Sequence, residues 1–194
     1  MNDKRYHHGN LKEALVEAGL EILGESGLAG LSLRTCAARV GVSHTAPKNH
    51  FGTMSGLLTA IAARGYAQLA DRMRRDLADD ATRRQIRNAA FRGYVDFARA
   101  QPALFELMFS GGRTNRDDPA LKEGVMACFE ILRAASQDLD WDKADLPDAE
   151  LRAQIMTWSL VHGFAQLALA GKLDKEATKT LGILDIVPDF GFRD

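Results

Sequence analysis

Long apolar runs are missing from this sequence of 194 residues. No run approaches the roughly 18 residues that a membrane-spanning helix needs. The first ten residues, MNDKRYHHGN, are polar and lack the apolar segment of a secretory signal peptide. We therefore expect a cytoplasmic protein that has no membrane partner.

An excess of either charge is also missing, because the formal net charge at pH 7 is −1. This balance excludes a protein that coats nucleic acid or anionic membranes indiscriminately, so any contact with DNA must be local. Within the first 52 residues, most acidic side chains fall in one predicted helix. Most basic side chains lie before that helix or after it.

Cysteines and recognisable catalytic patterns are scarce as well. Cys36 and Cys128 lie far apart in apolar, helix-like surroundings, so we expect buried reduced thiols rather than a disulfide. No Ser/His/Asp spacing, carboxylate pair or phosphate-binding loop stands out. The adjacent His7 and His8 have no further ligand at metal-binding spacing. We predict neither an enzyme nor a cofactor.

Helical periodicity is what the sequence has in abundance, and no strand pattern or internal repeat accompanies it. Hydrophobic residues make up 46% and charged residues 26% of the chain, which suits one or two globular domains with a real core. Apolar side chains recur at three- and four-residue spacing over almost the whole chain. We therefore predict an all-α fold with about nine helices.

Residues 32–51, SLRTCAARVGVSHTAPKNHF, have the pattern of a helix-turn-helix. Ser32 is a natural N-cap for a first helix over Leu33–Val40. Gly41 can adopt the left-handed conformation that turns the chain sharply. A short second helix is then expected over His44–His50.

The restricted positions of this motif are Ala37, Gly41 and Val42. Ala37 is small, as two helices that cross over a short turn require at their contact. Pro47 falls near the end of the first turn of the second helix, where a missing backbone donor is tolerated. An ordinary helical hairpin in a protein core would produce a similar pattern, so this segment alone leaves both interpretations open.

Helices are also expected on both sides of the motif. Asn10 and Glu13 resemble a capping box, and an apolar stripe then continues to about Ser26. This first helix would close a three-helix core around the motif. A second stripe predicts a long helix from Leu57 to about Ala78. Free N–H groups at the start of that helix could hold a DNA phosphate.

A short basic arm precedes the first helix and consists of Lys4, Arg5, His7 and His8. Arms of this kind can reach into a minor groove or contact a phosphate. A frayed terminus without a role explains the same residues equally well.

The second half of the chain predicts further helices, which polar breaks at residues 110–119 and 138–147 separate. The long helix over residues 148–171 is apolar nearly all round, so both of its sides must be covered. Small residues in it, such as Ala165, allow close helix approach and favour a subunit interface at least as much as an intrachain core. A final helix is expected over residues 174–187.

The segment RYHHGNLKEALVEAGLEILGESG precedes the helix-turn-helix motif, and GLL follows it after a short break. Over these segments the chain resembles the N-terminal pattern of the TetR family of transcriptional regulators. QPALFELMF and WSLVHGFAQLALAG resemble the regulatory domain of a subgroup with a Trp-His-Gly signature, represented here by Trp158, His162 and Gly163. The resemblance implies a helix-turn-helix DNA-binding domain at residues 1–53. It also implies a helical ligand-binding and dimerisation domain at residues 54–194.

The resemblance further implies a homodimer, joined through the last two helices, that binds double-stranded operator DNA and a small-molecule effector. By motif position, the expected DNA-binding residues are Arg34, Ser43, His44, Thr45, Lys48, Asn49 and His50. Asn49 and His50 would lie near phosphates. Lys48 replaces the family's usual tyrosine and Met54 a common phosphate-binding lysine, so we expect weaker or differently specified DNA binding.

An effector pocket is predicted from aromatic, methionine and histidine side chains of the second domain. The candidate lining residues are Phe91, Tyr94, Phe105, Met108, Met126, Phe129, Trp158 and His162. The same residue types at helical spacing also form plain core, and a histidine in an apolar helix also suits a hydrogen-bonded structural role.

Two functional hypotheses follow. The first is a TetR-type repressor that a small molecule releases from a palindromic operator, with two reading helices in successive major grooves about 34 Å apart. The alternative is a helical small-molecule-binding or scaffolding protein with a degenerate DNA-binding domain. The near-neutral N-terminal segment and the residues at positions 48 and 54 motivate this alternative.

Overall fold

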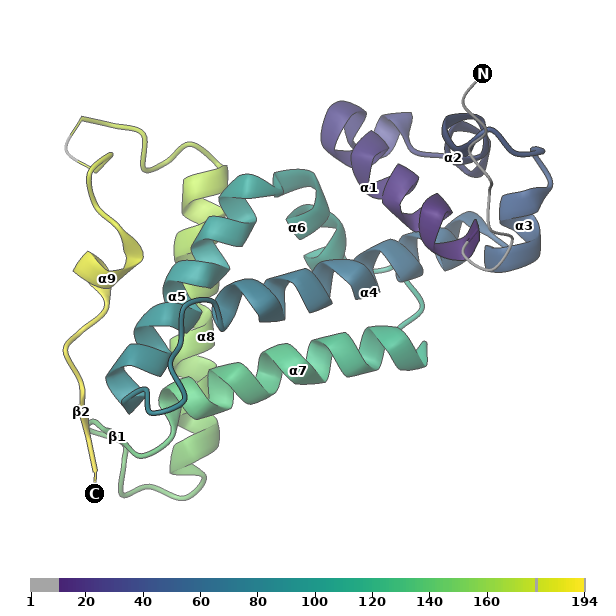
Figure 1. Cartoon of the computed structure of the whole chain (residues 1–194). Helices are drawn as coiled ribbons and strands as arrows, with labels where there is room; N and C mark the ends of the chain where they lie inside the picture. Colours follow the sequence, from purple (N-terminus) through teal and green to yellow (C-terminus); the bar gives the residue numbers. More distant parts are fainter. Residues whose placement is uncertain (1–10, 177, 194) are drawn as a thin grey trace. The chain divides into compact units, whose positions relative to one another are not determined.

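The computed structural model of the protein describes residues 11–176 and 178–193 (Figure 1). The elements in this part of the chain are α1 (Leu11–Gly30), α2 (Leu33–Val40), α3 (Ala46–Phe51), α4 (Met54–Met73), α5 (Arg83–Ala100), α6 (Pro102–Phe109), α7 (Pro119–Ser136), β1 (Leu139–Asp140), α8 (Ala149–Leu169), α9 (Ile183–Ile186) and β2 (Gly191–Phe192). The predicted all-α class is confirmed. The basic arm with Lys4, Arg5, His7 and His8 lies outside the described residues, as does Asn10.

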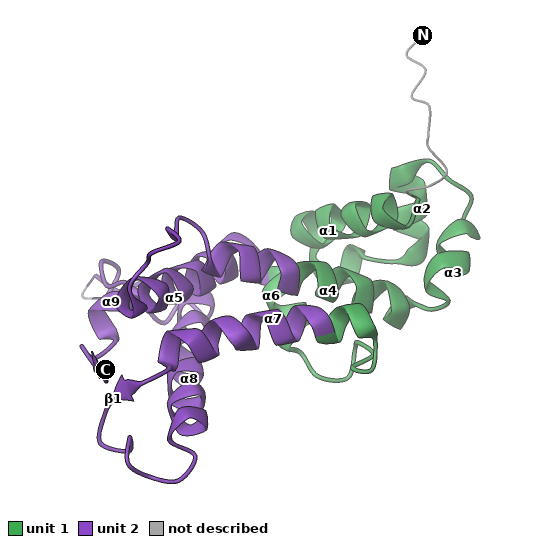
Figure 2. Ribbon diagram, turned by 60° about the horizontal axis from the view of Figure 1, so that its bottom comes forward, with its two compact units in different colours: residues 1–65, 103–122 green, residues 66–102, 123–194 purple. Residues whose placement is uncertain are grey.

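The chain divides into two compact units (Figure 2). Unit 1 contains residues 1–65 and 103–122, and unit 2 contains residues 66–102 and 123–194. Helix α4 therefore contributes to both units, and α6 belongs to the unit that holds the helix-turn-helix. The domain boundary expected after residue 53 falls within unit 1 and remains a prediction.

The core of unit 1 forms where α1, α2 and α3 contact one another and where α1 meets the start of α4. Leu15, Cys36 and Ile61 are fully buried there. A Cβ at Gly19 of α1 would lie only 2.6 Å from the Ile61 side chain, so glycine permits the close approach of these helices. α1 has a kink at Gly27, close to the position where its helical pattern was predicted to end.

The core of unit 2 is built on α5, which packs along α8 and also against α9. Phe91 and Tyr94 of α5 and Val161 of α8 are fully buried. Thr82 begins α5 with a capping box, in which its hydroxyl accepts from the N–H of Gln85. β1 and β2 pair antiparallel, with Leu139 opposite Phe192, and this pairing holds the C-terminal segment to unit 2.

Several of the predicted helix bounds are wrong, and one of them is the start of α4, which lies at Met54 rather than at Leu57. α4 ends at Met73 rather than near Ala78, and α3 begins at Ala46 rather than His44. The helix expected over residues 174–187 is reduced to Ile183–Ile186. The hydroxyl of Thr178 donates to the backbone carbonyls of Leu173 and Lys175, and such local bonds compete with a regular helix.

Both cysteines are buried free thiols, as predicted. Burial raises the pKa of Cys36 to about 11 and that of Cys128 to about 12, so both thiols remain protonated at neutral pH. The Cys128 thiol donates to the backbone carbonyl of Tyr66. None of the helices in the described part of the chain combines the length and the apolar character of a membrane span.

Candidate functional site

The turn between α2 and α3 is fixed by backbone hydrogen bonds. Gly41 has a left-handed conformation with φ of 78°, and its N–H donates to the carbonyls of Ala37 and Ala38. The N–H of Val42 donates to the Ala37 carbonyl at 3.0 Å. These bonds satisfy carbonyls that the end of α2 would otherwise leave open, so the chain leaves α2 in one direction.

The start of α2 is fixed as firmly as its end. The Ser32 hydroxyl accepts from the N–H of Thr35, and the Thr35 hydroxyl accepts from the N–H of Ser32. This reciprocal pair is a capping box. The Thr35 hydroxyl also lies 3.0 Å from the Gly30 carbonyl, which ties the beginning of α2 to the end of α1.

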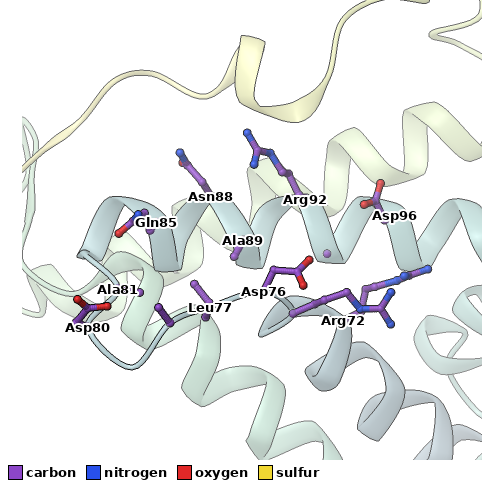
Figure 3. A pocket seen from close by; sticks show the side chains of 13 residues that line it. Arg72, Asp76, Leu77, Asp80, Ala81, Gln85, Asn88, Ala89, Arg92 and Asp96 are labelled. Carbon is purple, nitrogen blue, oxygen red and sulfur yellow. The ribbon is translucent and has the colours of Figure 1, made fainter.

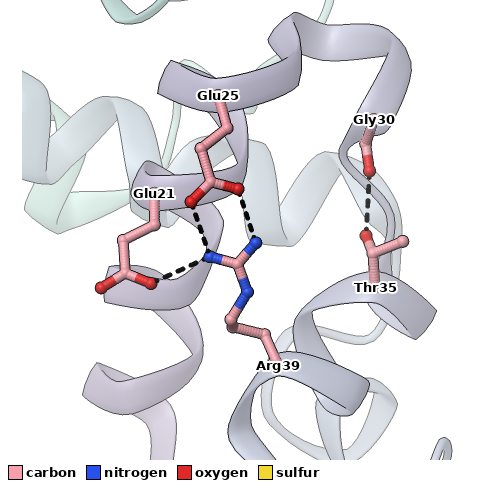
Figure 4. A network of polar contacts seen from close by, with 5 residues as sticks. All are labelled: Glu21, Glu25, Gly30, Thr35 and Arg39. Carbon is pink, nitrogen blue, oxygen red and sulfur yellow. Dashed lines mark hydrogen bonds and ion pairs between the residues drawn. The ribbon is translucent and has the colours of Figure 1, made fainter.

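Arg39 joins α2 to α1 through two carboxylates (Figure 4). Its guanidinium donates two hydrogen bonds to Glu25, at 3.1 and 2.6 Å, and one to Glu21 at 3.1 Å. The hydrogen bond from Arg39 lowers the pKa of the Glu25 carboxyl. In the sequence, Arg39 is one of the basic residues of the motif. In the structure, its guanidinium is paired with Glu21 and Glu25, so its charge is not free for a ligand.

All seven predicted DNA-binding residues are exposed. Lys48, Asn49 and His50 lie on α3, and Arg34 is the second residue of α2. Ser43, His44 and Thr45 lie in the turn before α3, with the hydroxyls of Ser43 and Thr45 3.1 Å apart. Within the described part of the chain, Arg34 and Lys48 have no ion-pair partner.

The opposite side of the motif is buried. Cys36 and Ala37 of α2 and Pro47 of α3 turn inward. Pro47 occupies the first turn of α3, where a helix does not need its N–H. The motif thus presents one apolar side to unit 1 and one polar side to solvent. This polar side can donate hydrogen bonds to base edges and phosphates.

The predicted effector residues do not all belong to one unit. Phe105 and Met108 lie on α6 in unit 1, and both are buried. The other six lie in unit 2, where Phe91 and Tyr94 are fully buried. Met126 is 55% exposed, which does not suit the lining of an enclosed pocket within one protomer.

Tyr94, Trp158 and His162 form one cluster in unit 2. The Tyr94 hydroxyl lies 2.8 Å from Nδ1 of His162. The Trp158 ring packs edge-on against Phe129, with centroids 5.3 Å apart, and lies 6.3 Å from the His162 ring. Burial raises the pKa of Tyr94, so its phenol remains protonated. His162 thus has a hydrogen-bond partner on α5, and its role as an effector residue stays a prediction.

The pH dependence of stability gives a test of this cluster. Burial lowers the pKa of His162 below the ordinary value of 6.5, so the unfolded state binds a proton more readily than the folded state. Neutral His162 therefore contributes to the free energy of unfolding above pH 6.5. This contribution is lost as the pH falls through the folded-state pKa of His162. We expect denaturant melts to show a smaller acid loss of stability for His162→Gln than for the unsubstituted protein. Equal losses in both proteins would contradict the pKa shift.

A polar cleft was not predicted from the sequence (Figure 3). It lies between the end of α4 and α5 in unit 2, has a volume of about 370 Å³, and is lined by Arg72, Arg75, Asp76, Asn88, Arg92 and Asp96 among others. None of the predicted effector residues lines it. Its residues come from the end of α4, from the polar connection that follows and from α5, so no apolar periodicity marks them. Among the described residues, no group of three or more His, Cys, Asp or Glu side chains could hold a metal ion.

Comparison with known proteins gives matches in both sequence and structure. The family described as "Tetracyclin repressor-like, C-terminal domain" matches residues 88–184. The HTH-type transcriptional regulator CymR of Pseudomonas putida is 32% identical over 131 residues, which cover 64% of this chain and 61% of that relative. The chain thus matches less than two thirds of that relative's length.

Two solved structures extend the likeness to almost the whole fold. A protein of unknown function from Rhodococcus sp. RHA1 is 28% identical, with a TM-score of 0.72 and coverage of 95% of this chain and 93% of that one. A TetR variant from Acinetobacter baumannii AYE, solved in complex with minocycline, is 18% identical. Its TM-score is 0.58, with 89% of this chain and 87% of that chain covered.

Proposed function

Because this chain belongs to the TetR family of DNA-binding transcriptional regulators, we propose that it is a repressor that a small molecule releases from a palindromic operator. Members of this family are regulators rather than enzymes. The observation that carries the proposal is the two-sided helix-turn-helix: its apolar side is buried and its seven polar candidate residues are exposed. Membership of the Trp-His-Gly subgroup remains a prediction.

In the proposed complex, α3 and the turn before it enter the major groove. Arg34, His44, Thr45 and Lys48 face base edges, and Asn49 and His50 lie near phosphates. The exposure of these side chains and the lack of ion pairs for Arg34 and Lys48 among the described residues support this assignment. Two such surfaces, related by a twofold axis, require half-sites about 34 Å apart.

The proposed dimer interface uses the exposed side of α8 together with α7. Leu151, Ile155 and Leu167 of α8 and Met126 of α7 are exposed although they are large and apolar. The sequence predicted an interface through the last two helices, but α9 has only four residues and buries Ile183 against its own unit. Apolar side chains left in solvent by one protomer favour burial by a second copy.

The proposed effector binds the cluster around Tyr94, Trp158 and His162. A hydrogen-bonded polar pair within aromatic surroundings is the combination that fixes the orientation of a mostly apolar ligand. The minocycline complex of a protein with a similar fold supports a small-molecule site in this architecture. Release from DNA requires a ligand with higher affinity for the conformation that does not fit the operator.

A mobility-shift titration with DNA from beside the protein's own gene tests the proposal. A repressor is expected to retain one fragment specifically, with an affinity that falls as salt rises. Binding of small molecules without specific retention of any fragment at any salt concentration would favour the alternative, a helical small-molecule-binding or scaffolding protein. The near-neutral charge of the first 52 residues and the pairing of Arg39 with Glu21 and Glu25 motivate that second candidate.

A further inference from the structure

We propose that the loop between α6 and α7, residues 110–118, carries an additional DNA phosphate contact through Arg113 and Arg116. This inference rests on the proposed DNA-binding function and extends it to a part of the chain outside the helix-turn-helix. The loop belongs to unit 1, the unit that holds α1, α2 and α3 (Figure 2), and two hydrogen bonds join it to α4.

Hydrogen bonds fasten the loop to the first turns of α4. The Ser55 hydroxyl donates to the backbone carbonyl of Arg113 at 3.1 Å, and the N–H of Asn115 donates to the Thr59 hydroxyl at 2.8 Å. Thr59 is buried, and its hydroxyl in turn donates to the Ser55 carbonyl at 2.7 Å. Ser55 is the second residue of α4, and only Gly52 and Thr53 separate that helix from α3. Arg113 is therefore held beside the first turn of α4, the helix that follows α3.

The acidic residues of this loop are already engaged, whereas its arginines are available. Asp117 pairs with Lys122 at 2.9 Å, and this hydrogen bond lowers the pKa of the Asp117 carboxyl. The Asp118 carboxylate accepts from the N–H of Leu121 in the first turn of α7. Arg113 and Arg116 are exposed, and neither forms an ion pair within residues 11–176 and 178–193.

The helix-turn-helix itself has few free cations for a phosphate backbone. Of the basic residues between Leu11 and Gly65, Arg39 pairs with Glu21 and Glu25, and Arg64 pairs with Glu17. Met54 opens α4 with an uncharged side chain. Of the lysines and arginines in this range, only Lys12, Arg34 and Lys48 have no ion-pair partner among the described residues. The two loop arginines supply positive charge beside the position where Met54 supplies none, and phosphate contacts dominate the affinity of proteins for DNA.

The test is the double variant Arg113→Ala/Arg116→Ala in the full-length dimer. Because Arg113 accepts from Ser55 through its main chain, the substitution keeps the loop fastened to α4. We expect binding to operator and to unrelated DNA to weaken by a similar factor, as for phosphate contacts that carry no sequence information. The slope of log affinity against log salt is expected to become shallower by about 0.9 for each phosphate that the variant no longer neutralises.

A matched control removes two exposed positive charges from unit 2 with Arg99→Ala/Lys172→Ala, which should leave affinity and salt slope unchanged. If the loop variant keeps the affinity and salt slope of a protein that binds its operator, the phosphate contact of the loop is disproved. If the unsubstituted protein binds no DNA, the proposed function itself fails. An equal decrease of affinity in the loop variant and the control would also overturn the proposal, because net charge alone would then explain it.

The variant Ser55→Ala tests whether the position of the loop matters. Removal of the hydroxyl that holds Arg113 is expected to weaken DNA binding in the unsubstituted background and to have no effect in the Arg113→Ala/Arg116→Ala background. An equal decrease in both backgrounds would mean that Ser55 does not act through the loop arginines.

Discussion

Replacing Ile155 with glutamate is expected to leave the protein monomeric and to weaken operator binding by about 100-fold or more. Ile155 is 52% exposed on α8 and shares one side of that helix with Leu151 and Trp158. A carboxylate there would be buried without a partner in the dimer, and a symmetric interface would contain this unfavourable burial twice. Each monomer would then bind one half-site without the gain from the second. Sedimentation equilibrium and operator titration measure the two effects.

The control for this variant is Ile186→Glu on α9. Ile186 is 48% exposed and also apolar, so it matches Ile155 in type and exposure. We expect Ile186→Glu to remain dimeric, because α9 uses Ile183 to pack within its own unit. A monomeric Ile186→Glu together with a dimeric Ile155→Glu would place the interface at the C-terminal segment instead. Since both side chains are exposed in the protomer, neither variant should unfold it.

Ala165 shows why the interface could not be identified from the sequence of α8. Its helix is apolar nearly all round, so periodicity gave no way to tell the side that faces α5 from the side that faces solvent. In the structure Ala165 is fully buried within unit 2, whereas Ile155 is exposed. A charge at Ala165 would therefore disrupt the protomer and would not report on the dimer.

The helix-turn-helix was predictable because local residue chemistry determines it. Ser32 caps α2, Gly41 takes the left-handed conformation at its end, and Ala37 is buried, each for the reason that the sequence suggested. The start of α3 was less predictable. Pro47 is equally acceptable at several positions of a first turn, so it limits where the helix begins without fixing it.

Features that depend on long-range contacts were not predictable. The pairing of Arg39 with Glu21 and Glu25 joins residues that are up to 18 positions apart, and no pattern along the chain marks it. The hydrogen bond from Ser55 to the Arg113 carbonyl spans 58 positions. In the sequence, residues 110–119 form only a polar break. Their place beside α4 follows from how α6 packs back on that helix, with Leu104 and Met108 against Gly65.

Replacing Lys48 with alanine is expected to weaken operator binding by roughly 1–3 kcal/mol, a factor of about 5 to 150. Lys48 is exposed on α3, and within the described residues it has no carboxylate partner, so its ammonium group is free to approach DNA. If Lys48 contacts a guanine edge, the loss of affinity is confined to the operator. Where it contacts a phosphate, the decrease extends to unrelated DNA and the salt dependence becomes shallower.

Two further variants separate these outcomes. Lys48→Arg keeps the charge and should retain a phosphate contact, while the different shape of the guanidinium should alter a base contact. Arg39→Lys leaves a charge that Glu21 and Glu25 continue to neutralise, so it should change neither operator preference nor salt slope. Unchanged affinity of Lys48→Ala for every DNA tested would remove Lys48 from the interface. A cation at this position would then be no substitute for the tyrosine that the family usually carries there, and the loop arginines and Arg34 would have to supply the contacts instead.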